Sequence, residues 1–208
     1  EGIGLNGGLG VGHAILHITD LAVADLVAAA PAAERYRLHH AFSEMHGSLD
    51  ELLTDDALAE GGEHRDVLKT YRLIAEDAGW LTRIEDAIET GLTAEAAVQR
   101  VQNDIRARMA KVTDSYLRER VHDLDDLARR LMLHLMGGTG MAVAKDLPEH
   151  AILIAHSLGP AELLDYDHDR LAAVVLEEGS PASHVAIIAR ALDIPVVGRA
   201  RDIIQQVD

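Results

Sequence analysis

One histidine stands where its side chain could act as a nucleophile. His184 follows residues 177–183, in which a buried strand ends at an acidic pair and a glycine and a proline favour a turn. Ser183 is placed to cap a helix that begins near His184. The positive end of the helix dipole attracts anions and disfavours the imidazolium, so a neutral imidazole keeps a lone pair that could attack phosphorus. From this local pattern alone, His184 is more often a histidine at a capped helix end on the surface than a catalytic residue.

The roles of the residues around His184 stay open at this point. Arg190, about two turns along the helix, could contact a phosphate or pair with a surface carboxylate. Glu177 and Glu178 could orient His184 or merely end the strand. No metal site is expected, because cysteine is absent and the clustered histidines of the first long helix lack the spacing with a carboxylate that a zinc-binding helix needs.

The net charge of −16 limits the kinds of partner. Nucleic acid needs a basic face, so it is excluded, and a basic protein partner is favoured. The acidic excess is densest over residues 44–66, which predicts a docking surface, although a solvated acidic helix would have the same composition. The carboxylates expected to bind the partner are Glu44, Asp50, Glu51, Asp55 and Asp56. No apolar run is long enough to span a membrane and the first residues do not resemble a secretory signal, so a cytoplasmic protein is expected.

Helical periodicity dominates the middle of the chain. Apolar side chains recur every three or four residues, which predicts long amphipathic helices packed as an antiparallel bundle. One stripe is expected to run unbroken over residues 67–81 and another over residues 98–116. Gly91 is expected to end one helix and Thr93 to cap the next.

Short apolar runs flank this helical region, and they predict buried strands. The candidate strands are residues 11–18, after a flexible glycine-rich loop, and residues 151–155, 172–176 and 194–197, with a helix over 183–192. Strands that alternate with a helix indicate an α/β unit with parallel pairing. Because a lone strand is unstable, the first one is expected to join the later sheet. The predicted fold is an α/β domain of residues 1–23 and 141–208, with an all-α bundle of residues 24–140 inserted and residues 137–140 as a linker.

The stretch from Gly179 to Gly198 resembles the signature around the phosphorylated histidine of phosphoenolpyruvate-utilising enzymes. The matching residues are Gly179, Ser183, His184, Ala186, Ile187, Ala189 and Arg190, then Ile194, Pro195, Val197 and Gly198. The layout, with a helical insertion after the first strand, resembles that of Enzyme I of the bacterial phosphotransferase system, whereas dikinase-type enzymes lack such an insertion. Residues 159–166 and 176–179 resemble the nitrogen-related paralogue more than the sugar-transport enzyme.

The resemblance implies a swivelling phosphohistidine domain. Phosphoenolpyruvate would donate a phosphoryl group to Nε2 of His184, and a small histidine phosphocarrier protein docked on the helical insertion would receive it. Gly179, Ser183 and Arg190 would support His184. Magnesium and phosphoenolpyruvate would bind a barrel further along the full enzyme, so this chain would be a fragment that holds no cofactor and exchanges phosphoryl groups only with the carrier. The resemblance also implies that the full enzyme is a homodimer and that the fragment is a monomer.

Three positions depart from the family pattern, and two other functions stay open. Ser180 and Ala182 replace a glycine and a threonine, and Gly159 stands where a hydroxyl residue is usual, so the details of the phosphate cradle are in doubt. The alternatives are a swivelling domain of a pyruvate phosphate dikinase-like enzyme and a non-catalytic module that signals phosphorylation state. The helical insertion argues against the first alternative.

Overall fold

The computed structural model describes residues 2–17, 21, 23–54, 62–112, 114–137 and 147–207. The chain forms two compact units. The α/β unit contains the described residues of 1–19, 52–68 and 141–208, and the helical unit contains those of 20–51 and 69–140. The described residues of 52–68, which the sequence places within the helical domain, therefore belong to the α/β unit. No helix in the described ranges is long and apolar enough to cross a membrane.

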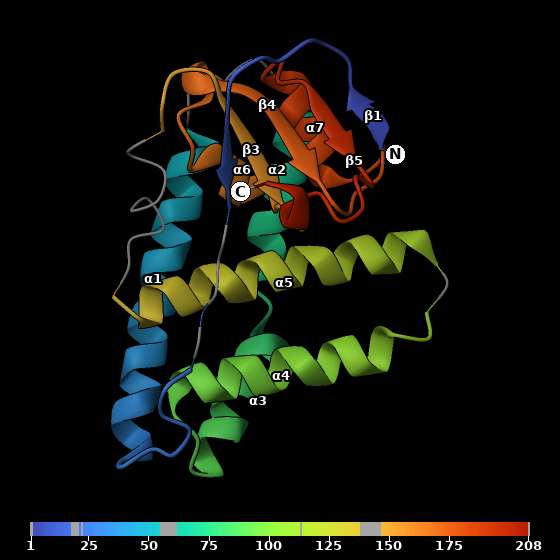
Figure 1. The fold of residues 1–208 in the computed structure, drawn as a ribbon. Helices are drawn as coiled ribbons and strands as arrows, with labels where there is room; N and C mark the ends of the chain where they lie inside the picture. Colours follow the sequence, from blue (N-terminus) through green and yellow to red (C-terminus); the bar gives the residue numbers. More distant parts are fainter. Residues whose placement is uncertain are drawn as a thin grey trace. The chain divides into compact units, whose positions relative to one another are not determined.

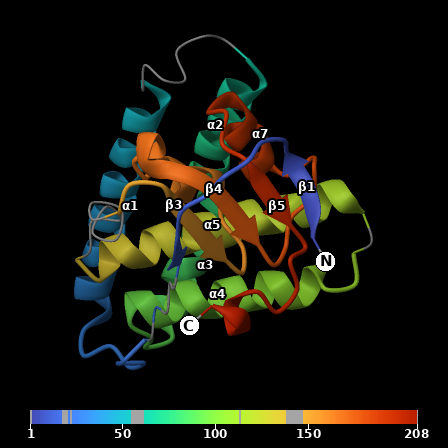
Figure 2. The same cartoon turned by 45° about the horizontal axis from the view of Figure 1, so that its top comes forward.

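A five-stranded sheet forms the α/β unit, and its strands come from both ends of the chain (Figure 1). They are β1 (Ile3–Asn6), β2 (His13–Leu16), β3 (Ala151–Ala155), β4 (Leu171–Leu176) and β5 (Val196–Gly198), in the order β1-β5-β4-β3-β2. Strands β2, β3, β4 and β5 are parallel, and β1 pairs antiparallel with β5. The pairing of β2 with β3 confirms that the N-terminal strand joins the later sheet. Figure 2 shows β1, β5, β4 and β3 side by side.

The glycine-rich start of the chain is where the sequence interpretation was wrong. Residues predicted as a flexible loop contain β1, whose Leu5 is buried and whose Asn6 side chain donates to the Ile194 carbonyl at 2.7 Å. The glycines that follow pass close to other backbone. A Cβ atom on Gly12 would lie 1.6 Å from the His150 carbonyl oxygen, so glycine here permits close approach rather than mobility.

Two short helices that follow β3 and β4 pack against the sheet. They are α6 (Pro160–Leu164) and α7 (His184–Ala191). Helix α7 buries Val185, Ala186, Ile188 and Ala189 in a core that also contains Leu153, Leu163, Val174 and Leu176. Each large aliphatic side chain removed from water in this way contributes about 1.5–3 kcal/mol before the entropic cost of folding. The buried face of α7 therefore fixes the direction of the helix that begins with His184.

The described residues of the inserted region form five helices: α1 (Pro31–Leu53), α2 (Glu63–Ala75), α3 (Ala78–Glu89), α4 (Ala94–Met109) and α5 (Ser115–Leu135). The 4, 3, 4, 3 spacing of Leu38, Phe42, Met45, Leu49 and Leu52 also predicts one apolar stripe, and α1 confirms it, since the first four are buried and Leu52 is partly buried. In α5, Leu127, Leu131 and Leu135 are buried in the same way. The structure confirms the predicted helix boundary at Thr93, whose hydroxyl accepts from the Ala96 amide.

Two of the predicted stripes are broken. The stripe over 67–81 is divided between α2 and α3, because the Asp77 carboxylate caps α3 by accepting from the amides of Gly79 and Trp80. The buried residues of α3 therefore include Trp80 and Ile84, whereas the expected Ala78 is exposed. The stripe over 98–116 likewise ends with α4 at Met109, and residue 116 belongs to α5.

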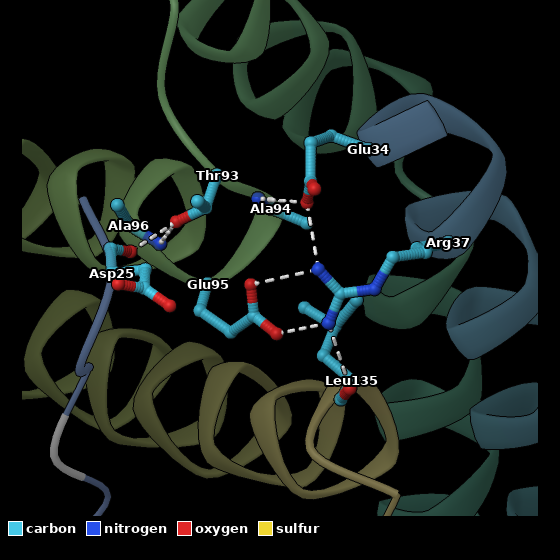
Figure 3. A network of polar contacts seen from close by, with 8 residues as sticks. All are labelled: Asp25, Glu34, Arg37, Thr93, Ala94, Glu95, Ala96 and Leu135. Atoms are coloured by element: carbon cyan, nitrogen blue, oxygen red, sulfur yellow. Dashed lines mark hydrogen bonds and ion pairs between the residues drawn. The ribbon is translucent and has the colours of Figure 1, made fainter. Parts of the chain in front are cut away.

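A polar network ties three helices of the helical unit together (Figure 3). The Arg37 guanidinium on α1 donates to Glu34 at 2.7 Å and to both carboxylate oxygens of Glu95 on α4, and it reaches the Leu135 carbonyl at the end of α5 at 3.1 Å. These carboxylates raise the pKa of Arg37, chiefly through the hydrogen bond with Glu95. Because the last carbonyls of a helix have no partner within it, Arg37 also caps α5.

Candidate functional site

His184 is the first residue of α7, and it lies at the carboxyl edge of the parallel strands, after β4. The side chain is half-buried. The Ile187 amide makes an early intrahelical bond, to the Ser183 carbonyl at 3.1 Å. The amides at the very start of the helix have no acceptor one turn earlier within it, so the site attracts anions. The predicted placement of His184 at a helix N-terminus is confirmed.

The predicted capping role of the Ser183 side chain is wrong. Ser183 occupies the N-cap position, but its hydroxyl donates to the Ser180 carbonyl at 2.8 Å, and its amide donates to the same oxygen at 3.0 Å. The residue is buried. Its hydroxyl therefore closes the turn before the helix instead of capping the helix, because the local turn competes for the same group.

Gly179 starts this turn in a conformation that favours glycine. Its φ is +119°, and a Cβ atom there would lie 3.1 Å from Cδ1 of Leu5 on β1. The edge strand that the sequence interpretation missed therefore lies beneath the turn that carries His184. The expectation that glycine supplies a special backbone angle here is confirmed.

Arg190 contacts the same turn from the other end of α7. Its Nη2 atom donates to the Pro181 carbonyl at 3.3 Å, and its side chain is exposed. Of the two roles left open, phosphate binding and pairing with a carboxylate, neither describes this contact. Arg190 holds the loop that precedes His184, which makes it a supporting residue through the backbone.

A second histidine at this edge was missed. His156 follows β3 directly, and Glu177 and Glu178 follow the neighbouring strand β4. His156 Nδ1 lies 2.8 Å from a Glu177 carboxylate oxygen, and Nε2 lies 3.5 Å from one of Glu178. The hydrogen bond with His156 is the main reason why the pKa of Glu177 is lowered. Adjacent parallel strands end at the same edge, so the positions of these residues just after two strand runs were the signal that could have revealed the contact.

Another polar cluster joins the end of β2 to the segment after β3. His17 Nδ1 lies 2.5 Å from the Tyr166 hydroxyl, and Nε2 lies 3.7 Å from the buried Glu162 carboxylate. The other Glu162 oxygen accepts from the Gly159 amide at 3.0 Å. The Glu162 carboxylate therefore contacts the backbone of Gly159, the residue that stands where the family usually has a hydroxyl side chain. Burial, and then the nearby carboxylates of Glu162 and Asp165, raise the pKa of Tyr166 to about 12.

The predicted docking carboxylates are only partly described. Glu44, Asp50 and Glu51 are exposed on α1, and Asp55 and Asp56 lie outside the described residues. Asp50 accepts from Arg72 Nε at 2.7 Å, and this hydrogen bond holds its pKa below the ordinary value. Glu44 lies 3.4 Å from His40 and 3.8 Å from His134. Part of the acidic charge is therefore compensated within the helical unit.

Among the residues that the structure describes, no group of three or more histidine, cysteine, aspartate or glutamate side chains is placed to hold a metal ion.

Comparison with known proteins assigns the chain to a family. The family described as PEP-utilising enzyme, N-terminal, matches residues 1–120, and the family described as PEP-utilising enzyme, mobile domain, matches residues 147–208. A phosphoenolpyruvate-protein phosphotransferase of Streptomyces coelicolor is 34% identical over 198 residues. These cover 95% of this chain but only 35% of the length of that relative.

Two solved structures have the same fold. An NMR solution structure of Enzyme I superposes with a TM-score of 0.67 at 25% identity, over 100% of this chain and 85% of that one. The N-terminal domain of a nitrogen Enzyme 1 superposes with a TM-score of 0.65 at 28% identity, over 93% of this chain and 80% of that one. The predicted fold class, an α/β domain with an inserted helical bundle, is thus confirmed. The chain belongs to the phosphoenolpyruvate-utilising enzymes, and its fold is that of the N-terminal region of Enzyme I.

Proposed function

We propose that this chain carries a phosphoryl group on Nε2 of His184 and passes it to a small histidine phosphocarrier protein, as part of a nitrogen-type phosphotransferase system that draws on phosphoenolpyruvate. The observation that carries the proposal is the position of His184 at the start of α7, at the carboxyl edge of a parallel sheet. Ligands of open α/β sheets bind at this edge. The family match and the phosphotransferase relative agree with this chemistry.

The chemistry needs a nucleophile and an anion-binding helix end. The neutral imidazole attacks phosphorus through its Nε2 lone pair, so a new N–P bond forms while the donor's bond to phosphorus breaks. In the second transfer the carrier's histidine attacks, and the N–P bond at His184 breaks in turn. The start of α7 stabilises the charge on the phosphoryl oxygens throughout, and positioning supplies most of the remaining rate.

The helical unit supplies a docking surface in this proposal. The exposed carboxylates Glu44, Asp50 and Glu51 lie on α1, and the whole chain carries −16. A basic carrier is attracted to such a surface, which raises the rate of encounter more than it raises affinity. The nitrogen-type assignment draws support from the nitrogen Enzyme 1 structure and from the resemblance of residues 159–166 and 176–179.

Labelling with phosphorylated carrier tests the proposal. The chain is mixed with phosphorylated carrier protein. Phosphohistidine is then mapped by mass spectrometry at alkaline pH, where the phosphorylated side chain survives. Label is expected on His184 and is expected to vanish in His184→Ala, while His168→Ala keeps it. Label that persists in His184→Ala would refute the assignment of the nucleophile. Binding of the carrier without any transfer would favour the interaction module.

A further inference from the structure

The segment between β1 and β2 crosses the sheet at the amino ends of the parallel strands, and both of its ends are anchored. The Asn6 side chain donates to the Ile194 carbonyl at 2.7 Å, just before β5. The His13 amide donates to the His150 carbonyl at 3.0 Å, just before β3. Figure 2 shows the chain running from β1 across the sheet. Residues 7–12, which lie between the two anchors, form what we call the crossing segment.

Alternate glycines hold the crossing segment close to the sheet. A Cβ atom on Gly8 would lie 2.5 Å from Cγ of Pro195, which precedes β5. A Cβ atom on Gly10 would lie 2.4 Å from the Ala172 carbonyl oxygen in β4, and Gly12 approaches the start of β3 in the same way. These distances are far shorter than van der Waals contact, so only glycine fits. The backbone of the crossing segment therefore lies against the starts of three neighbouring strands and has no room to move inward.

The residues between these glycines are large and apolar. The side chain of Leu9 is 89% exposed and that of Val11 is 76% exposed. Because the backbone beneath them is already packed against the strands, neither side chain can be buried by an inward movement of the crossing segment. Single apolar side chains are common on a protein surface, whereas a pair held on a fixed backbone is suited to binding, since little conformational entropy is lost when it is covered.

An exposed carboxylate stands beside each anchor of the crossing segment. Asp193 and Glu149 are the residues directly before the two anchoring carbonyls, so their Cα atoms lie about 3.8 Å from those of the anchoring residues. Among the residues that the structure describes, no cation pairs with either carboxylate. Arg170, which precedes β4 at the same edge, lies 3.4 Å from an Asp167 carboxylate oxygen, so its charge is offset. This edge thus presents an apolar pair between two negative charges.

We propose that the crossing segment is a docking surface for a basic protein, which offers an apolar pocket to Leu9 and Val11 and arginine or lysine side chains to Asp193 and Glu149. Charge complementarity selects this occupant. A second copy of the chain is disfavoured, because two copies that met through this face would bring four carboxylates together. His184 lies at the opposite, carboxyl edge of the parallel strands, so the inference does not depend on the proposed function.

Photocrosslinking followed by titration tests the proposal. The photoreactive residue p-benzoylphenylalanine replaces Leu9 in the 208-residue chain, and it replaces Tyr36 on α1 as the matched control, since Tyr36 is 74% exposed. Each chain is irradiated in an extract of the cells that make it. A protein captured at position 9 but not at position 36 is identified, purified and titrated against the unmodified chain by calorimetry, and only this titration counts as support.

Two pairs of substitutions separate the apolar and the charged contributions. Leu9→Ser with Val11→Ser should weaken binding at least tenfold, because apolar surface is no longer buried. Asp193→Asn with Glu149→Gln should weaken it about two- to fivefold and should reduce its sensitivity to salt; asparagine also accepts the φ of +54° at position 193.

Three results would overturn the inference. One is the absence of any protein captured at position 9 beyond those captured at position 36. Another is crosslinking to copies of this chain alone, which would make the surface a self-association site. The third is a captured protein whose affinity is unchanged in the double-serine variant or does not fall as salt rises, while circular dichroism shows that each variant is folded.

Discussion

Replacing Gly179 by alanine should destabilise the α/β unit through the backbone of the turn before His184. At φ +119° an alanine is strained, at a cost of about 1–3 kcal/mol. The new Cβ atom would lie 3.1 Å from Cδ1 of Leu5, the movable end of a flexible side chain, so overlap adds little. We expect a loss of about 2 kcal/mol in the free energy of unfolding, or roughly 4–8 °C in Tm for a chain of this size.

Urea unfolding followed by circular dichroism measures this loss, with the midpoint shifted and the slope unchanged. Two glycines serve as controls. Gly4→Ala introduces a Cβ with no atom within 4 Å and should stay within about 0.5 kcal/mol of the wild type. Gly198→Ala has no left-handed φ but brings its Cβ to 2.7 Å from Leu5 Cδ1, so it reports overlap alone.

Two results would refute the reasoning about Gly179. One is a Gly179→Ala variant as stable as Gly4→Ala, which would mean that the turn adjusts without strain. The other is a penalty that disappears when Leu5 is shortened to alanine, because contact with the edge strand would then be the cause rather than φ.

Other consequences of the structure can be measured independently. Arg37→Met should lower the free energy of unfolding of the helical unit by about 1–2 kcal/mol, a value reduced because the Arg37 side chain is 41% exposed. The control Arg83→Met, on the exposed face of α3, should change it by less than about 0.5 kcal/mol. Equal effects of the two variants in urea unfolding would contradict a structural role for the network in Figure 3. The raised pKa of Tyr166, about 12 against an unfolded value of 10.0, favours the neutral phenol in the fold, so this contribution to stability is complete below pH 10 and is lost as pH rises toward 12. Ultraviolet titration of phenolate should show a late component that Tyr166→Phe removes. A titration curve that Tyr166→Phe leaves unchanged at high pH would count against it. Binding of phosphocarrier to the chain should weaken as salt rises, because exposed charges are screened; equal affinity by calorimetry at low and high salt would show that docking is apolar.

Much of the fold could be predicted from short segments of sequence. Strands β3 and β4 and the stripe of α1 were predicted because each depends on residues that are neighbours in the chain. The insertion was predicted because a single strand needs a sheet, and the later apolar runs were the available partners. Strand β1 could not be found in this way. It is a four-residue edge strand that depends on its pairing with β5, almost two hundred residues along the chain.

In the candidate site, too, some features depend on neighbouring residues of the chain and others depend on tertiary contacts. The sequence by itself determined that His184 begins a helix after a buried strand and a glycine turn, because strand, turn and helix signals all lie within one continuous segment. Only the tertiary structure decided that His156 pairs with Glu177, since that contact exists where two parallel strands end side by side. It also decided that the Ser183 hydroxyl closes the turn instead of capping the helix, because the Ser180 carbonyl and a helix amide compete for this hydroxyl and three-dimensional geometry selects between them.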